Sequence, residues 1–534
     1  MSVRAAGPRR RIDLVNAAAL ALLIVLSSWV LAVDLWQVVA HGRSWTGTGG
    51  MFLVDQMQYL AWVQDASHHL LVSNLFTLAP TTADFAQPLI IVSGGLAALG
   101  VAPYLALLVW QPVAVLGLYF SVRAYVRRAL EPSAGRGWAL VLGLFFIGSG
   151  SLIADKLIPT GLAARLQWSA ITADLWLGFW SWGYPFGLIA LAATLAAILR
   201  YERAAPSRSP GWAPPALGAL ASLIHPWQGA TLIIVLLGAE LLSARVGTAI
   251  RLRPLLITVT ATALPLVYFL ALNHLDPSWT NAQNAARGSF PLWMIAATVA
   301  PLAIPAALAY RIPPRTFVAL VTRLWPFAAL ALFLFSETRF GSVPTHALLG
   351  ISIPLAVLAV EGVGSLPAFR AHARRGWWVA ALVGVAFVPA TAYGMSTARR
   401  LLAPGPVHGQ ASGPGDANYI APGERRALDF LAADASPGGV LTRFYLGTVV
   451  PGLTGRRTYV GNPYFSPNYL NRSAAADALF LGQLGPRAAR ELARASGARF
   501  LLSDCRSPAS VSAELSPISS SVHHFGCATV FVLP

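Results

Sequence analysis

Long apolar stretches alternate with short polar turns over roughly the first 395 residues of the chain. A helix needs about 20 mostly apolar residues to cross a bilayer, and fewer where it is broken or buried in protein. On this pattern the sequence predicts eleven membrane spans. They lie at 14–38, 102–127, 137–153, 179–200, 213–228, 230–246, 254–274, 289–310, 316–335, 345–366 and 377–395.

Two stretches between the first and second spans fit helices on the membrane surface. Residues 54–72 are too polar to cross a bilayer, and a helical period places Asp55, Tyr59 and Trp62 on one face. Residues 88–101 are apolar, but counting them as a span would move every later arginine-rich turn to the other side. We therefore predict two outward surface helices. An acid at the start of the first could act as a base on a lipid-carried substrate.

The apolar stretch 213–246 is interrupted by His225, Pro226 and Gly229. One continuous helix here would invert the arginine-rich turns that follow, whereas a helical hairpin keeps them on one side. Proline and glycine at the break leave backbone groups unpaired, which a membrane tolerates only where protein or water takes their place. The sequence therefore predicts a hairpin that turns at His225.

The pattern changes after residue 395. Gly, Pro and Ser are frequent in 396–423, which is typical of a linker. Helices and strands then alternate over 424–534, which predicts a small α/β domain. Helices are expected at 424–434, 473–482 and 486–496, and strands at 439–445, 458–460, 499–503 and 528–533. The predicted fold is thus an α-helical polytopic membrane domain (1–395) followed by an α/β domain.

Composition and charge place both domains relative to the membrane. The chain is 56% hydrophobic, so lipid must be its second solvent. The net charge of +17 comes from arginines clustered in alternate turns, which indicates membrane topology and no nucleic-acid partner. These clusters predict a cytoplasmic N-terminus and an extracytoplasmic C-terminal domain. The richness in Arg and Ala favours a bacterial plasma membrane as the location.

The candidate acid and histidine lie at the outward side. Asp55 is either a general base or a helix N-cap, whose carboxylate accepts hydrogen bonds from free backbone N–H groups. His225 sits at the predicted break of a membrane hairpin, where a histidine is costly without a partner. It either serves function or makes a structural hydrogen bond. The aromatic run 176–184 could stack on a sugar or anchor the chain at the interface.

The candidate cations also have two readings each. Lys156 is the only lysine of the chain, and it either contacts a phosphate or pairs with the neighbouring Asp155. Arg165 lies in the same outward loop. Arg339 could bind a lipid phosphate through its planar guanidinium, or pair locally with Glu337.

The two cysteines, Cys505 and Cys527, each lie beside a predicted strand of the α/β domain. They either form a disulfide, closing a loop worth about 3 kcal/mol, or remain buried thiols. The sequence contains no phosphate-binding loop of the GKS/T type, no HExxH helix, no Cys-x-x-Cys pair and no nucleophile elbow. ATP-driven chemistry and metalloprotease chemistry therefore have no support.

This order of elements resembles the GT-C superfamily of integral-membrane glycosyltransferases. The likeness rests on an outward loop that opens with Asp55 and Tyr59, and on a second surface helix that begins at Gln87-Pro88. The stretches 438–442 and 450–461 also resemble the outer domain of bacterial members.

The resemblance implies an inverting hexosyl- or pentosyltransferase that uses a polyprenyl-phosphate sugar donor and a cell-envelope glycan or lipid acceptor. Asp55 would be the general base and Arg339 a contact to the leaving phosphate, with Lys156 or Arg165 sharing its charge. The remaining substrate-binding residues would be Tyr59, His225 and Glu337.

One position departs from the family pattern. Many members have two adjacent acids where this chain has Asp55 and Gln56, so no metal ion or other cofactor is expected. The same departure is compatible with an inactive member. Two other functions remain open: a transporter or flippase, because broken helices also occur in transporters, and a non-catalytic assembly protein whose outer domain binds glycan or partners.

Overall fold

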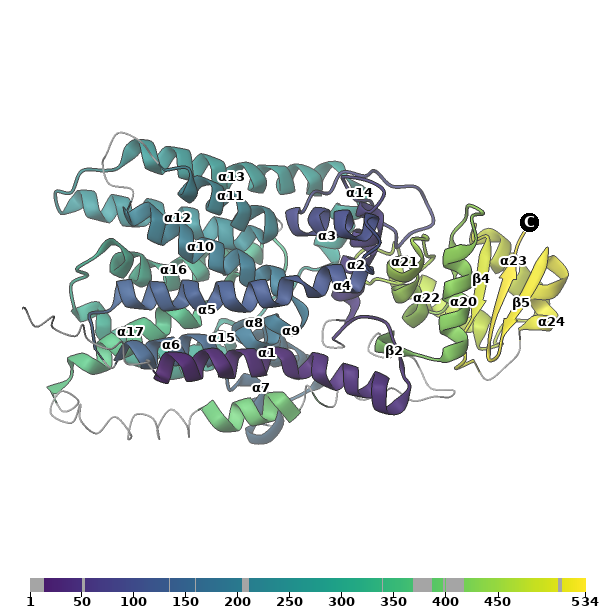
Figure 1. Ribbon diagram of the computed structural model, residues 1–534, viewed down its shortest axis with the longest axis horizontal. Coiled ribbons are helices and arrows are strands. Elements are labelled where there is room, and N and C mark those ends of the chain that lie inside the picture. Colours follow the sequence, from purple (N-terminus) through teal and green to yellow (C-terminus); the bar gives the residue numbers. More distant parts are fainter. Residues whose placement is uncertain are drawn as a thin grey trace, which may run out of the picture.

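The computed structural model describes residues 14–49, 53–133, 135–158, 160–203, 211–338, 340–367, 387–396, 399, 417–507 and 511–534. A bundle of long helices runs along the long axis of the molecule, and a smaller part made of helices and strands lies at one end of it (Figure 1). The chain thus has a predominantly helical bundle and a small C-terminal sheet, as the sequence predicted.

Within the described residues, eight helical segments are long and apolar enough to cross a membrane. They are α1 (Leu14–His41), α4 with α5 (Pro103–Leu108, Trp110–Ala129), α10 (Pro185–Arg203), α12 (Pro226–Arg245), α13 (Leu252–Leu275), α15 with a 3-10 turn (Leu292–Ala307, Leu308–Arg311), α16 (Phe317–Ser336), and a 3-10 turn with α17 (Pro344–Leu348, Ser352–Ser365). The bent pair α6 (Gly135–Phe145) and α7 (Gly150–Leu152), which continues into a π-helical turn (Ile153–Leu157), forms a ninth if counted as one span. The chain is a multi-pass membrane protein.

The remaining two of the eleven predicted spans differ from these nine. Helix α11 (Ala213–Ile224) has only 12 residues, about 18 Å of helix, which is shorter than the hydrocarbon core. The predicted span 377–395 lies largely outside the described residues, although 387–396 is helical. The predicted span 179–200 begins later, at Pro185, because a separate short helix, α9 (Leu177–Gly183), precedes it. The number of eleven stays a prediction.

The predicted helical hairpin is present. Helices α11 and α12 run antiparallel, since Gly229 faces Ser222 and Gly218 faces Leu232 across the pair. A Cβ on Gly229 would lie 2.9 Å from the Cα of Ser222, so only glycine allows this close approach. The chain reverses at His225, whose backbone is extended between the two helices.

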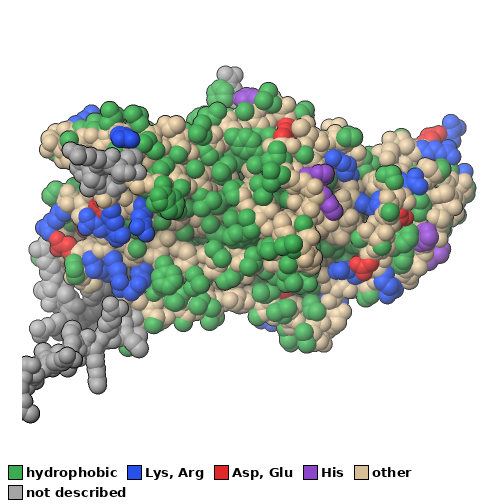
Figure 2. Space-filling model, turned by 45° about the horizontal axis from the view of Figure 1, so that its top comes forward, with side chains coloured by type: hydrophobic (Ala, Val, Ile, Leu, Met, Phe, Trp, Pro, Cys, Tyr) green, Lys and Arg blue, Asp and Glu red, His purple; other side chains and the backbone are tan. Residues whose placement is uncertain are grey.

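Arginines collect where the long helices end, away from the C-terminal part. Arg128 at the end of α5 pairs with Glu202 at the end of α10, and Arg251 before α13 pairs with Glu240 of α12. Figure 2 shows Lys and Arg side chains gathered at this end, with a broad hydrophobic surface between them and the opposite end. The structure thus brings the arginine-rich turns together on one side of the bundle.

The other end of the bundle is built from short helices. They are α2 (Leu53–Ala66), α3 (Pro88–Ala98), α8 (Leu162–Leu175), α9 and α14 (Pro277–Ala285). The first predicted surface helix, 54–72, ends earlier because the Asp65 carboxylate accepts hydrogen bonds from the backbone N–H and hydroxyl of Ser73, which folds the chain back. The second, 88–101, ends earlier because Gly100 adopts a φ of +93°. Most of α2 is buried by other parts of the protein, and its position at the outer membrane surface stays a prediction.

The C-terminal part is a four-stranded mixed sheet with helices on both faces. The strands are β3 (Val440–Leu441), β4 (Phe500–Ser503), β5 (Ser521–Phe525) and β6 (Ala528–Val532), in the order β3-β4-β6-β5 with only β3 and β4 parallel. The helices are α20 (Pro422–Ala433), α21 (Phe444–Thr454), α22 (Tyr469–Phe480), α23 (Pro486–Ala495) and α24 (Ser512–Leu515), with a 3-10 turn at Ser516–Ile518. Phe500 and Leu502 pack in one hydrophobic cluster and Leu501 in the other, as alternation along a strand requires.

Two expectations for this part need correction or completion. The predicted strand 439–445 is only two residues long, because α21 begins at Phe444. Arg443, just before this helix, forms an ion pair with Asp477. Strand β5 was not predicted. Cys505 and Cys527 form a disulfide, which decides between the two alternatives for these residues.

The C-terminal part is fastened to the bundle at several points. A short strand, β1 (Ser44–Trp45), pairs with β2 (Tyr419–Ile420). Asp34, near the end of α1, accepts hydrogen bonds from the Tyr419 hydroxyl and from the Asn418 amide. Most of the predicted linker 396–423 lies outside the described residues, so its boundaries stay predictions.

Candidate active site

Asp55 lies in the first turn of α2, at the junction of the bundle and the C-terminal part (Figure 1). The hydroxyl of Tyr184 donates a hydrogen bond to its carboxylate. Tyr184 is the residue between α9 and α10, where its backbone N–H bonds to Trp180 O at 2.8 Å and Pro185 begins the next helix. A short rigid connection therefore aims the phenol at the acid.

Burial raises the pKa of Asp55 to about 6, although the hydrogen bond from Tyr184 partly opposes this rise. Burial and then the charge of Asp55 raise the pKa of Tyr184 well above its ordinary value, so the phenol stays protonated and can donate. Asp55 is thus a carboxylate at neutral pH, with a higher proton affinity than an ordinary aspartate. This combination suits a general base.

Aromatic rings form the surroundings of the Asp55 carboxylate. Tyr59, one turn further along α2, lies 5.9 Å from the ring of Tyr184 and 5.2 Å from that of Phe186. Tyr464 comes from the C-terminal part, and burial followed by the charge of Asp55 raises its pKa. Three tyrosines from different segments therefore surround the acid, with hydroxyl groups that could hydrogen-bond a sugar.

The segment that carries Tyr464 is held directly against α2. The Asn462 side chain accepts a hydrogen bond from Tyr464 N at 2.8 Å and donates one to Gln58 Oε1 at 3.1 Å. Both amide side chains are buried. The C-terminal part therefore contributes a wall of the site in a fixed position.

Gln56 lies where many GT-C members have a second acid, and its side chain has a structural role. Its Oε1 accepts a hydrogen bond from Gly49 N at 2.6 Å, and its Nε2 donates to Trp182 O at 3.1 Å. A carboxylate can accept but cannot donate, so it could not make the second bond. The amide therefore fixes the start of α2, one residue from Asp55.

A second polar group lies deeper, between the helical hairpin and the turn before α17. His346 Nε2 is 4.0 Å from Asp174 Oδ1, and the rings of His225 and His346 are 5.3 Å apart. Trp180 contacts both histidine rings and donates its indole N–H to the Asp174 backbone carbonyl at 3.1 Å. Trp180 also lies 5.3 Å from the Tyr184 ring, which connects this group to Asp55.

The side chains of this second group have unused hydrogen-bonding capacity. His225 is only 7% exposed, and within the described residues neither of its ring nitrogens has a hydrogen-bond partner. Burial, and to a smaller extent the charge of Asp55, raises the pKa of Asp174 to about 7, while a hydrogen bond from Thr345 opposes the rise. A buried polar side chain without a partner costs free energy, which a bound polar substrate would recover.

The other residues proposed from the sequence lie elsewhere or make local contacts. Lys156 Nζ pairs with Asp155 at 3.1 Å, in the π-helical turn that follows α7. Arg165 is exposed on α8. Glu337 accepts a hydrogen bond from Phe290 N at 2.8 Å and so joins two loops. Arg339 lies outside the described residues.

Tyr184 was proposed from the sequence only as part of the aromatic run 176–184, and Asp174, His346 and Tyr464 were not among the proposed site residues. Tyr184 ends the tryptophan-rich run, and that run was the available signal for it. Asp174 is an acid among aromatic residues, which is a weaker signal. Tyr464 lies about 400 residues from Asp55 in the chain, and no local pattern connects them. Among the described residues, no three His, Cys, Asp or Glu side chains are grouped so that they could hold a metal ion.

Comparison with known proteins adds evidence on the fold. No family model and no curated protein matches the sequence. Among solved structures, the chain is similar to the Archaeoglobus fulgidus oligosaccharyltransferase in the apo form, with 12% identity, a TM-score of 0.53, and coverage of 92% of this chain and 70% of the other. The same enzyme in complex with Zn and sulfate gives 13% identity, a TM-score of 0.50, and coverage of 91% and 67%.

A third similar structure is ArnT from Cupriavidus metallidurans bound to undecaprenyl phosphate, with 14% identity, a TM-score of 0.47, and coverage of 96% and 97%. At such low identity, likeness establishes a shared fold and does not establish a shared substrate. The chain therefore shares its fold with the Archaeoglobus fulgidus oligosaccharyltransferase, which agrees with the fold expected from the resemblance to GT-C glycosyltransferases.

Proposed function

We propose that this protein is an inverting glycosyltransferase that moves a sugar from a polyprenyl-phosphate donor to a glycan or lipid acceptor of the bacterial cell envelope. The observation that carries the proposal is Asp55, an acid of raised pKa that accepts a hydrogen bond from Tyr184 and lies near Tyr59 and Tyr464. The fold shared with an oligosaccharyltransferase supports the same class of reaction.

In this mechanism Asp55 is the general base. Its carboxylate takes the proton of an acceptor hydroxyl, and the oxygen attacks the anomeric carbon of the donor sugar. The bond from that carbon to the phosphate oxygen breaks, and its electron pair leaves with the lipid phosphate. Attack opposite the leaving group inverts the anomeric configuration. A base with a pKa of about 6 is ionised at neutral pH and still accepts a proton readily.

His225 is proposed to orient a substrate. Its ring lies within the protein next to His346 and Trp180, and its nitrogens have no partner among the described residues. A phosphate oxygen or a sugar hydroxyl would supply one. The contact of Arg339 to the leaving phosphate stays a prediction, as does a share of that charge for Arg165 or Lys156.

The proposal is tested by sugar transfer in membranes that contain the full-length protein and a panel of labelled polyprenyl-phosphate sugars. Asp55→Asn keeps an acceptor for the Tyr184 hydrogen bond but removes the base, so transfer should fall by about 100-fold or more. Asp65→Asn is the matched control, because Asp65 lies on the same helix and holds Ser73. Full transfer by Asp55→Asn would refute the assignment of the base.

The transporter or flippase alternative predicts a different result. If wild-type protein transfers no sugar from any donor of the panel but moves a lipid-linked sugar across vesicles, the enzyme proposal is wrong. No specific observation in the structure favours this alternative over transfer.

The proposed reaction side is the extracytoplasmic face, because α2, which carries Asp55, lies next to the C-terminal part (Figure 1), whereas Arg128 and Arg251 lie at the opposite ends of the long helices. A reporter fused after residue 410 should therefore be active only outside the cytoplasm. Cytoplasmic reporter activity at this position would overturn the proposed orientation.

A further inference from the structure

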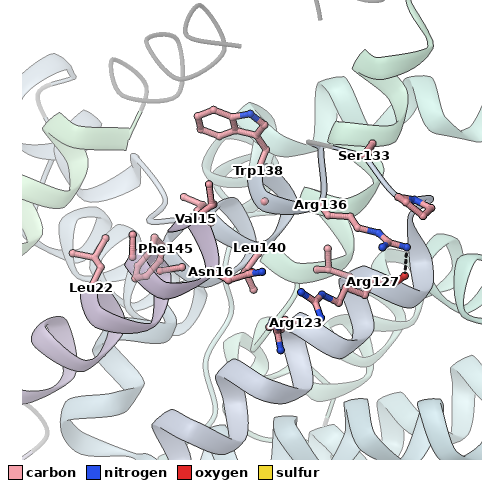
Figure 3. Close-up of a pocket in the computed structure, with 16 residues that line it drawn as sticks. Val15, Asn16, Leu22, Arg123, Arg127, Ser133, Arg136, Trp138, Leu140 and Phe145 are labelled. Atoms are coloured by element: carbon pink, nitrogen blue, oxygen red, sulfur yellow. Dashed lines mark hydrogen bonds between the residues drawn. The ribbon is translucent and has the colours of Figure 1, made fainter. Parts of the chain in front are cut away.

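A cavity of about 720 Å³ opens between α1, α5 and α6, at the end of the bundle opposite the C-terminal part. It lies far from Asp55, since its lining comes from the first turns of α1, the last turns of α5, and α6. Figure 3 shows the lining side chains, with three arginines on one side and apolar groups on the other. The proposed reaction gives this cavity no role.

The polar side of the cavity is formed by Arg123, Arg127 and Arg136. Arg136 donates to backbone carbonyl oxygens, namely Leu130 O at 2.7 Å and Arg127 O at 2.6 Å (the latter drawn in Figure 3). The half-buried Arg123 has an Nε without a hydrogen-bond partner in the described part of the chain. Among the described residues that line the cavity, none is Asp or Glu.

Other arginines at the same end of the bundle are paired differently. Four of them make ion pairs with glutamate side chains: Arg128 with Glu202, Arg251 with Glu240, Arg315 with Glu131, and Arg323 with Glu361. Carbonyl oxygens hold the Arg136 side chain in place but do not neutralise its charge. Arg123 and Arg136 therefore carry positive charge that an anion could balance.

The apolar side of the cavity extends along the bundle. Leu22, Val141 and Phe145 line both this cavity and a second one of about 360 Å³. The second cavity is lined almost wholly by apolar side chains, including those of Leu26 on α1 and of Val388. An arginine-rich opening thus leads into a continuous apolar groove on the surface that faces the membrane.

We infer that this groove binds an anionic phospholipid from the membrane face opposite the C-terminal part. Its phosphate lies against Arg123 and Arg136, and one acyl chain follows the groove past Leu22 and Phe145. A guanidinium binds phosphate oxygens with charge-assisted hydrogen bonds, and the apolar lining of the groove matches an acyl chain.

Native mass spectrometry of the full-length protein in detergent tests this inference. Phosphatidylglycerol and phosphatidylcholine with identical acyl chains are added in turn, and retained lipid is counted. The wild type should retain one phosphatidylglycerol at least about 10-fold more tightly than phosphatidylcholine, as expected for a desolvated charge pair. Arg123→Gln should remove most of this preference. The control is Arg200→Gln, which removes an exposed arginine at the same end of the bundle.

A second pair of variants tests the groove without changing any charge. Leu22→Trp should fill the passage between the two cavities and weaken retention of phosphatidylglycerol. Val25→Trp is the control, because Val25 is exposed on α1 but lines neither cavity. Both variants should fold normally, because Leu22 and Val25 are exposed and their replacement does not change the hydrophobic core.

Three outcomes would overturn the inference. Equal retention of both lipids would mean an unselective annulus. An unchanged preference in Arg123→Gln would remove the arginine from the site. Displacement of phosphatidylglycerol by inorganic phosphate, together with no effect of Leu22→Trp, would identify a site for a free anion instead of a lipid.

Discussion

The hydroxyl of Tyr184 is hydrogen-bonded to the carboxylate of Asp55, which joins the connection between α9 and α10 to the first turn of α2. The bond favours the ionised acid, whereas burial favours the protonated one. The proton affinity of the proposed base thus depends on a residue about 130 positions away in the chain.

Removing the Tyr184 hydroxyl should change the pH dependence of transfer. In Tyr184→Phe the ionised form of Asp55 loses a hydrogen bond, so its pKa should rise above about 6. A hydrogen bond to a charged group is worth roughly 1.5–3 kcal/mol, so the acidic limb of the rate profile should move up by about one pH unit or more. Tyr310→Phe, at the other end of the bundle, is the control. An unmoved limb would contradict the role of Tyr184.

Asp174 should limit stability at alkaline pH. Its pKa is raised from 3.8 to about 7, so folding favours the neutral acid, and this contribution is lost as pH rises through about 7. Asp174→Asn is neutral at all pH values and keeps an acceptor for Thr345. It should melt about 2 °C or more above the wild type near pH 8, and at the same temperature near pH 4, by differential scanning fluorimetry. A lower melting temperature near pH 8 would contradict this.

An acid introduced beside Asp55 should lower both the stability and the sugar-transfer activity of the protein. Gln56→Glu loses the hydrogen bond to Trp182 O and places two acceptors together, which should cost about 1–3 kcal/mol of stability. We expect a lower melting temperature and reduced transfer. Gln64→Glu, on the partly exposed side of the same helix, should change neither. A fully stable and active Gln56→Glu would show that the two amide bonds are dispensable.

The disulfide should stabilise the C-terminal part. It joins residues that are 22 positions apart, and a loop of this length corresponds to about 3 kcal/mol in the free energy of unfolding. The double variant Cys505→Ser/Cys527→Ser should therefore melt at a lower temperature, and reductant should lower the melting temperature of the wild type only. If reductant has no effect on the wild type, the bond does not contribute in this way.

Most helices of the bundle could be predicted because each is a long apolar stretch bounded by arginines. The exceptions are elements whose positions depend on distant partners. Helix α21 contains Gly447 and Pro451, which argue against a helix locally, yet it is buried against both the sheet and α2. Strand β5 lies at an edge of the sheet and contains His523 and His524, so its polar composition did not indicate a strand.

The candidate site could be predicted only in part, for a similar reason. Asp55, Tyr59 and His225 are visible from local pattern, since an acid or histidine in an apolar setting is unusual. Tyr464 reaches Asp55 only because the C-terminal part folds back onto α2, which tertiary packing alone decides.

The hydrogen bond between Asn462 and Gln58 has a consequence for protein engineering. An exchange of C-terminal parts between two such proteins at the linker would separate these partners and leave two buried amides unmatched. A working chimera would need to carry α2 and the following loop, where Arg457 contacts Asn74 O and Ala79 O, together with the C-terminal part. The exchangeable unit is therefore discontinuous in sequence.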